Sequence, residues 1–189
     1  MLFYAVLTFI IIQRLLELAV AKRNEKWMRE QGAVEIGQSH YKWIVLVHFL
    51  FFISLISEVV WMERKLSSFW GLLAAIFLFT QLGRLWTIAS LGRFWNTKIL
   101  VLPKADVVLK GPYKFLKHPN YVIVALEFLI IPLLFEAYTT MVLFSLLNIL
   151  VLSIRIPAEE KALSAFTNYK EVTECHSRFL PVKNDKNSH

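Results

Sequence analysis

The sequence predicts an all-α, polytopic integral membrane protein with five transmembrane helices and a cytoplasmic C-terminal helix. Three observations support this fold class. Hydrophobic residues make up 57% of the 189 positions and the mean hydropathy is +0.52, which is too apolar for an ordinary soluble domain. The apolar residues are concentrated in five long runs, and most Lys and Arg residues lie between those runs. We therefore expect a single membrane-embedded domain over residues 1–189.

The apolar pattern places five spans at about residues 2–21, 43–60, 69–91, 119–134 and 138–154. The last two are short, and Pro132 is expected to kink or stop the fourth helix near its end. A cytoplasmic helix is expected over about residues 155–176. The polar tail at residues 181–189 is expected to be disordered.

The distribution of Lys and Arg predicts the orientation in the cell membrane. Segments 22–42, 93–117 and 155–189 hold five, six and six of these residues, whereas segment 61–68 holds two and the turn after Leu134 holds none. Because Lys and Arg favour the cytoplasmic side, we expect the amino terminus outside and the carboxyl terminus in the cytoplasm. We therefore predict a multi-pass protein of the cell membrane, surrounded by the lipid bilayer.

Charge and cysteine content argue against several function classes. The formal net charge is +7, but the basic residues are divided among the apolar runs rather than gathered on one face, so we expect no nucleic-acid partner. Cys175 is the single cysteine, which leaves no internal disulfide, and no metal site is expected. The sequence leaves the oligomeric state open.

Two polar motifs bracket the last two apolar runs. The first is Gly111–Tyr121, reading GPYKFLKHPNY, and the second is Arg155–Lys161, reading RIPAEEK. About thirty mostly apolar residues separate them, enough to enter and leave a bilayer. Both motifs are therefore expected at the same cytoplasmic face, opposite one another.

The residue types in these motifs suit a ligand that carries both a carboxylate and an ammonium group. Pro119 is a natural first helical residue, and the free amide groups of a helix start can receive an anion. Arg155 and Glu159 are four residues apart and share a helical face. Each feature also has an ordinary structural explanation, because His-Pro is a common helix start and an Arg/Glu pair is usually a surface ion pair.

Five polar residues interrupt the apolar runs at one depth, in the cytoplasmic half of their spans: Arg14, Glu17, Gln81, Arg84 and Glu127. Ionisable groups are costly in a bilayer unless they are paired or face water. They can form the wall of a polar chamber beneath the motifs, or pair internally, as Arg84 would with Glu17 or Glu127. A chamber makes Arg14, Arg84 and Glu127 candidate substrate-binding residues.

Together the motifs resemble the isoprenylcysteine carboxyl methyltransferase family of integral membrane enzymes. The resemblance rests on GPYKFLKHPNY, the apolar hairpin, RIPAEEKAL and a later RFLP sequence, and it covers roughly residues 70–181. The short five-span form and the preceding GRFWNTKIL are similar to bacterial members that methylate alkylpyrones.

The resemblance implies S-adenosylmethionine as the methyl donor, bound at the cytoplasmic face. Carried over by position, the cofactor-binding residues are Lys98, Ala105, Asp106, Val107, Val108, Tyr113, His118, Pro119, Asn120, Tyr121 and Glu159. Glu159 would bind the ammonium group, the helix start at Pro119 the carboxylate, and a tyrosine ring the sulfonium. Lys98 replaces an uncharged residue of the family, so its ammonium group must point away from the cationic cofactor.

The resemblance also makes Arg155 the catalytic residue, which would bind the substrate and hold an anionic oxygen in line with the methyl group. The predicted reaction is O-methylation of a carboxylate or acidic enol or hydroxyl on a lipidic acceptor, such as an alkylpyrone or an isoprenylcysteine. A phospholipid N-methyltransferase is the closest alternative. A membrane reductase of the sterol-reductase type and a non-catalytic membrane protein are the remaining ones.

Overall fold

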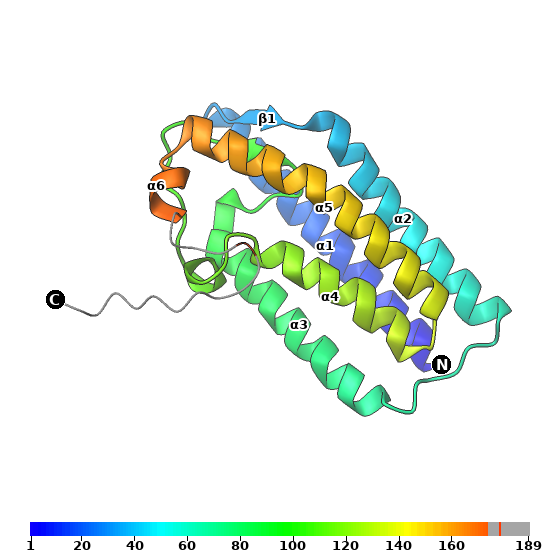
Figure 1. The fold of residues 1–189 in the computed structure, drawn as a ribbon. Coiled ribbons are helices and arrows are strands. Elements are labelled where there is room, and N and C mark those ends of the chain that lie inside the picture. The colour runs from blue at the N-terminus through cyan, green and yellow to red at the C-terminus, as the bar shows by residue number, and fades with distance from the viewer. Residues whose placement is uncertain (174–177, 179–189) are drawn as a thin grey trace.

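The computed structural model describes residues 1–173 and Arg178, and this part of the chain is nearly all helical (Figure 1). The helices are α1 (Leu2–Glu30), α2 (Gln38–Trp61), α3 (Trp70–Leu91), α4 (Pro119–Leu134), α5 (Tyr138–Phe166) and the short α6 (Tyr169–Thr173). Two single turns of 3-10 helix lie between α3 and α4, at η1 (Gly92–Phe94) and η2 (Gly111–Lys114). The tail expected to be disordered, residues 181–189, lies outside the described residues.

Within the described chain, four helices are long and apolar enough to cross a membrane: α1, α2, α3 and α5. Helix α4 is apolar but has 16 residues, so it is about 24 Å long, shorter than a hydrocarbon core of roughly 30 Å. Large apolar side chains cover the outer faces, including Phe49, Phe79 and Leu150. These features are those of a multi-pass membrane protein.

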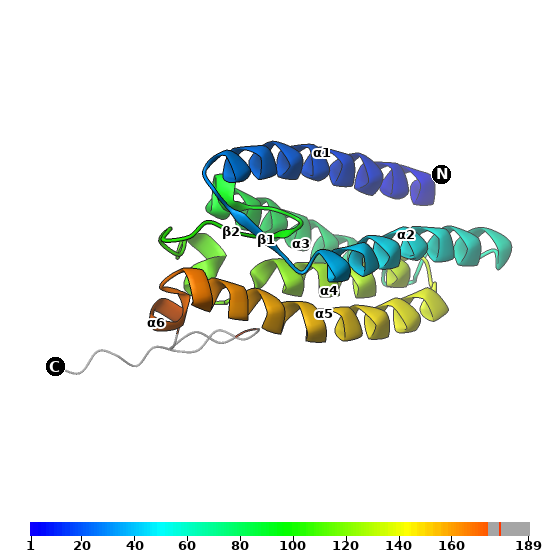
Figure 2. The same ribbon diagram turned by 90° about the horizontal axis from the view of Figure 1, so that it is seen from above.

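The two ends of the bundle differ. One end is filled by the main hydrophobic core, and we call it the solid end; the other end carries the strands, and we call it the strand end. The α2–α3 and α4–α5 connections and the amino terminus lie at the first end, and the strands and α6 lie at the other (Figure 1). Helices α1 and α5 lie on opposite sides of the bundle, with α3 and α4 between them (Figure 2). Phe51 of α2 packs against Phe128 of α4 and Phe144 of α5, with ring centroids 4.7 and 5.6 Å apart. These rings belong to the main core, which fills the first end.

Two helices extend further than the sequence suggested. Helix α1 runs to Glu30 instead of residue 21, because the polar residues after Ala21 end the apolar run without breaking the helix. Helix α5 passes through Pro157 and ends at Phe166. The sequence predicted a separate helix over about residues 155–176, and these bounds are wrong. Residues 155–166 are the last part of α5, and a bend at residues 167–168 separates them from α6.

A two-stranded antiparallel sheet departs from the expected all-α fold. Strand β1 (Val34–Ile36) pairs with β2 (Ile99–Val101), with Val34 opposite Val101. Ile99 and Val101 pack against Ala162 of α5. Three-residue strands show no usable alternation, and the partners lie far apart in the sequence, so the pattern could not predict the pair.

A carboxylate from α2 caps the start of α5 at the solid end. Glu58 accepts hydrogen bonds from the backbone N–H groups of Thr139 and Thr140, at 3.2 and 2.7 Å, and from the Thr140 hydroxyl at 2.8 Å. Arg64 lies 3.1 Å from the same carboxylate. The first amide groups of a helix otherwise lack partners, so Glu58 joins α2 to α5.

Gly111 allows the loop before α4 to lie against α3. Its φ angle is +55°, and a Cβ atom there would lie 2.1 Å from Ser90 Oγ and 2.9 Å from Trp86 Nε1. A side chain is therefore excluded both by backbone conformation and by the close approach.

We expect Glu58→Ala to lower the free energy of unfolding by about 2 to 4 kcal/mol, because it removes a helix cap and leaves Arg64 without its carboxylate. Thermal unfolding of the purified protein measures the change. Glu63→Ala is the matched control, since Glu63 is exposed. Equal stability of the two variants would contradict the capping role.

We expect Gly111→Ala to destabilise the protein more than Gly32→Ala. Both glycines have positive φ angles, +55° and +86°, but a Cβ at Gly32 would meet no described atom within 4 Å. Each variant bears a backbone cost of about 1 kcal/mol, and only Gly111→Ala adds the clash with α3. Equal melting temperatures would show that the contact with Ser90 is unimportant.

Candidate functional site

A cavity of about 760 Å³ occupies the strand end of the bundle, lined by side chains from α1 to α5 and from the loop between α3 and α4. Most of the residues that the sequence proposed for the site line it: Lys98, Ala105, Asp106, Val107, Val108, Tyr113, His118, Asn120, Tyr121, Glu159, Arg155, Arg84 and Arg14. Pro119 does not line it. Glu127 borders only a small void of about 10 Å³.

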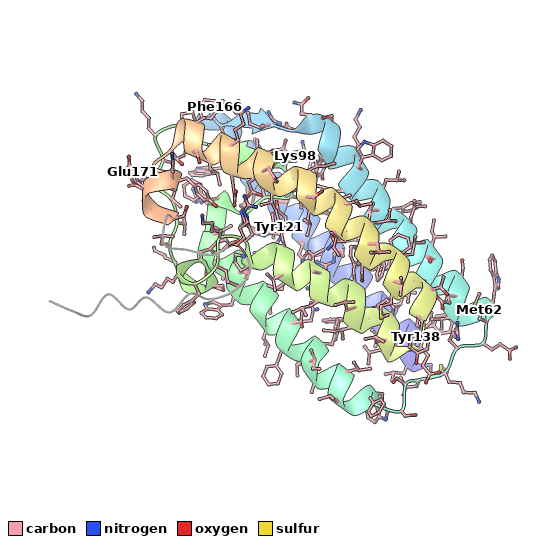
Figure 3. The ribbon with its side chains drawn as sticks, in the orientation of Figure 1. Met62, Lys98, Tyr121, Tyr138, Phe166 and Glu171 are labelled. Carbon is pink, nitrogen blue, oxygen red and sulfur yellow. The ribbon has the colours of Figure 1, made fainter. Side chains whose placement is uncertain are left out.

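The two polar motifs meet through a chain of hydrogen bonds on the cavity wall. Arg155 Nε donates to the Tyr121 hydroxyl at 2.7 Å, and that hydroxyl donates to the Glu159 carboxylate. Arg155 Nη2 also donates to the backbone oxygen of Thr97 at 2.6 Å. The start of α4, the last turns of α5 and the loop after α3 are thereby held together. Tyr121 lies at this strand end of the bundle, as does Lys98 (Figure 3).

His118 makes a second contact between the motifs. Its Nε2 lies 3.1 Å from Glu160, and Arg178 binds the same carboxylate, with Nε 2.9 Å from Oε1. The His118 ring stacks on Tyr121, with centroids 5.4 Å apart. His118 is also the residue before the first helical residue of α4. His118 therefore connects the two motifs in addition to lining the cavity.

Lys98 is held by acidic residues. Its Nζ lies 2.7 Å from Glu25 and 3.8 Å from Glu35. The hydrogen bond to Glu25 raises the pKa of Lys98, so the ammonium group stays charged and paired. The pairing neutralises the positive charge that the sequence placed awkwardly in a site for a cationic cofactor.

The loop before α4 covers the cavity and is anchored from both sides. Asn24 of α1 donates to the backbone oxygens of Gly92 and Trp95, at 3.0 and 2.8 Å. On the α5 side, the Lys104 N–H donates to the Phe166 oxygen at 2.9 Å. Tyr113 belongs to this cover, and its burial, with Glu159 nearby, raises the pKa of its phenol, so the ring stays neutral.

Four charged residues close the other end of the cavity. Arg14 of α1 pairs with Glu17 and Glu127, at 2.5 and 2.6 Å. Arg84 of α3 lies 3.0 Å from Glu17 and also pairs with Glu127. We call Arg14, Glu17, Arg84 and Glu127 the four-charge cluster. Both interpretations of these residues hold, since they pair internally while Arg14, Glu17 and Arg84 also line the cavity.

Sequence reasoning missed several cavity residues. Tyr41, His48 and Asn148 line the cavity but belong to no motif, and Trp95 and Thr97 line it from within GRFWNTKIL, where no site role was predicted for them. Tyr41 gave no signal, because its contact with Thr97, at 3.3 Å between the hydroxyls, depends on the tertiary fold. Within the described part of the chain, no group of three or more His, Cys, Asp or Glu could hold a metal ion.

Comparisons with known proteins identify the family of the chain. The model of the isoprenylcysteine carboxyl methyltransferase family matches residues 72–165, a range that includes both motifs. An uncharacterized protein of Bacillus subtilis, YpbQ, is 52% identical over 165 residues, which cover 87% of this chain and 98% of the relative. An uncharacterized protein of Haemophilus influenzae is 28% identical over 152 residues, covering 80% of this chain and 88% of the relative. The chain belongs to the isoprenylcysteine carboxyl methyltransferase family and is a membrane methyltransferase by that membership.

Proposed function

We propose that the protein transfers a methyl group from S-adenosylmethionine to an oxygen of a lipidic acceptor. The observation that carries the proposal is the Arg155–Tyr121–Glu159 chain of hydrogen bonds on the wall of a covered cavity. This chain of hydrogen bonds places the Arg155 guanidinium close to the Glu159 carboxylate. Arg155 would bind the acceptor oxygen, and Glu159 would bind the ammonium group of S-adenosylmethionine. The bacterial alkylpyrone-like form and a single domain over residues 1–189 are part of the same proposal.

The cavity residues suit this cofactor. Glu159 supplies an anion for the ammonium group, and Tyr113 and Tyr121 supply aromatic rings for the sulfonium. The buried polar atoms that lack a hydrogen-bond partner among the described residues include Trp95 Nε1, Asn120 Oδ1 and Tyr169 Oη. All three residues line the cavity. Because unpaired buried polar groups are costly, a polar ligand in this region would relieve them.

The remaining proposed cofactor contacts frame the same region. The loop residues Ala105–Val108 and Lys98 line one side of it, and His118 and Asn120 at the start of α4 line another. Pro119 would contribute through the backbone alone, by starting the helix whose free amide groups can receive a carboxylate. When bound, the cofactor supplies an electrophilic methyl group on a sulfonium.

Arg155 would act by holding the acceptor oxygen. Arg155 is 6% exposed, and its Nε and Nη2 are fixed by Tyr121 and Thr97. A carboxylate or acidic enol is already largely ionised near neutral pH, and a dry site that aligns it with the methyl group needs no general base. An amine acceptor would have to lose a proton, which disfavours phospholipid N-methylation.

The membrane arrangement that follows has five spans, with α4 as the short one, and a cytoplasmic carboxyl terminus. Helices α4 and α5 form a hairpin, so the first motif and the last turns of α5 lie on one side. The loops richest in Lys and Arg lie at the strand end, which the positive-inside rule assigns to the cytoplasm. The cofactor would then reach the cavity from the cytoplasm and the acceptor from the lipid.

We expect Glu159→Gln to weaken binding of labelled S-adenosylmethionine about 10- to 100-fold, because a charge-assisted contact is lost. Equilibrium binding to the purified membrane protein in nanodiscs measures this. Tyr121→Phe tests whether the loss comes from the carboxylate itself, since it removes the hydroxyl and leaves Glu159. Glu171→Gln, at an exposed position on α6, is the matched control. Unchanged affinity in Glu159→Gln would reject its role.

We expect Arg155→Lys to bind S-adenosylmethionine within about threefold of wild type and to lower methyl transfer about 100-fold, because lysine cannot reproduce the guanidinium geometry. The assay follows labelled methyl in the lipid fraction of membranes, and mass spectrometry identifies the methylated atom. Methyl found on nitrogen would favour the phospholipid N-methyltransferase. Full transfer by Arg155→Lys would remove Arg155 from catalysis.

We expect a fluorescent protein fused after Thr173 to fluoresce in bacteria, and alkaline phosphatase fused there to be inactive, because the carboxyl end is cytoplasmic. Fusions after Ser67, in the α2–α3 connection, should give the opposite pair of results. Phosphatase activity at Thr173 would reverse the orientation. Equal orientation of both positions would contradict the membrane crossing of α3 to α5.

A further inference from the structure

The cavity has a second set of polar side chains two helical turns from Arg155. On α5, Asn148 precedes Arg155 by seven residues, and on α2, His48 follows Tyr41 by seven residues. Seven residues are two turns, so the members of each pair share a helix face and lie about 10 Å apart along the axis. All four residues line the cavity. We call Arg14, Glu17, His48, Arg84 and Asn148 the floor cluster.

The floor cluster marks the end of the cavity. Arg14 and His48 border both the large cavity and the small void of about 10 Å³ beyond it. The His48 ring packs on Phe128, with centroids 5.1 Å apart, and Phe128 belongs to the main core at the solid end. Between the floor cluster and Arg155 the lining is apolar, with Val124, Val151 and Leu152. The cavity is therefore polar at two levels and apolar between them.

The floor cluster holds hydrogen-bonding groups that the protein itself does not use. Asn148 is 5% exposed, and no hydrogen bond joins its side chain to any described residue, although a buried amide normally has partners. Arg84 is 3% exposed, and its Nε has no partner within residues 1–173 and 178. Both side chains line the cavity.

His48 adds an acceptor to these donors. Its Nδ1 lies 2.8 Å from the backbone oxygen of Ile44. A carbonyl oxygen only accepts, so Nδ1 carries the hydrogen and Nε2 of the neutral ring is left as an acceptor. The floor cluster thus offers donors on Asn148 and Arg84 and acceptors on Asn148 and His48, a combination that suits a hydroxyl group.

We propose that the floor cluster binds an uncharged, oxygen-bearing group of the acceptor, a hydroxyl, about 10 Å from the oxygen that receives the methyl group. The inference rests on the proposed function for the position of the methylated oxygen. The bound group is uncharged because the four-charge cluster already balances two arginines with two glutamates, and an added charge would lack a counter-ion in a low-dielectric site. The acceptor class is an amphiphile with polar groups at both ends of an apolar chain.

Binding of two matched probes tests the inference. The probes are decanoate and ω-hydroxydecanoate, which differ only in the terminal hydroxyl. Wild-type protein in nanodiscs should bind ω-hydroxydecanoate about five- to tenfold more tightly, the equivalent of one or two net hydrogen bonds. The concentration dependence of the thermal midpoint gives both affinities. The inference is overturned if the affinities agree within about twofold, or if neither probe binds.

Two variants test whether Asn148 causes the tighter binding of ω-hydroxydecanoate. Asn148→Leu keeps the branched shape of the side chain and removes its polar atoms, so it should bind the two probes equally. Ile149→Asn places an amide on the neighbouring lipid-facing position, which is 62% exposed, and should keep the preference. A preference that survives Asn148→Leu would overturn the assignment. If that variant does not fold, His48→Phe takes its place with the same expectation.

Methyl transfer to the same probes separates this inference from the proposed function. A hydroxyl preference in binding without transfer of labelled methyl would support the floor cluster and count against a carboxylate acceptor. Transfer to both probes at equal affinity would support the methyltransferase and overturn the floor cluster.

Discussion

The four-charge cluster is the constraint on which the arrangement of the bundle depends. Two arginines and two glutamates from α1, α3 and α4 pair with one another among apolar helices. A single one of these charges left unpaired would be costly in such surroundings, whereas the complete set is neutral and hydrogen-bonded. Gln13 and Gln81 extend the network, with 2.8 Å between their amide groups and 2.8 Å from Gln81 to Glu127. The depth of α1 relative to α3 and α4 is thereby set.

The cluster also divides the molecule into a solid half and a hollow half. Along each of α1, α2, α4 and α5, side chains nearer the α2–α3 connection enter the main core, and side chains nearer the strands line the cavity. At the hollow end the elements are joined by polar contacts, such as Arg155 with Tyr121 and Asn24 with the loop after α3. A cavity of this kind can admit a ligand without unfolding the core, because the core lies elsewhere.

The sequence predicted the helices and the meeting of the two motifs, and it missed the parts that depend on tertiary contacts. An apolar hairpin returns the chain to the same side, so the meeting of the two motifs followed from the topology, whereas the individual contact between Tyr121 and Glu159 did not. The bounds of α1 and α5 did not follow, because a fall in hydropathy marks the edge of an apolar run and not the end of a helix. Strands β1 and β2 were missed because they are short and lie far apart in the sequence, with Glu35 opposite Leu100 in the central pair. Tyr41 and His48 carry no local signal, since only the packing of α2 beside α5 brings them to the cavity.

The two interpretations of the intramembrane charges prove to be complementary, and the reason bears on what the cavity can hold. A polar chamber wall built from unpaired charges would draw water into the bilayer and would spoil a site that depends on excluding it. Because Arg14 and Arg84 are neutralised by Glu17 and Glu127, the wall keeps its hydrogen-bonding directions without an excess charge. Such a wall can discriminate between uncharged groups of a ligand by hydrogen bonds, which a purely apolar pocket does poorly. The two ends of the cavity therefore differ in their chemistry. At the floor cluster the charges are balanced and hydrogen bonds remain for an uncharged group, whereas at the other end Arg155 and Glu159 offer a cation and an anion to charged groups.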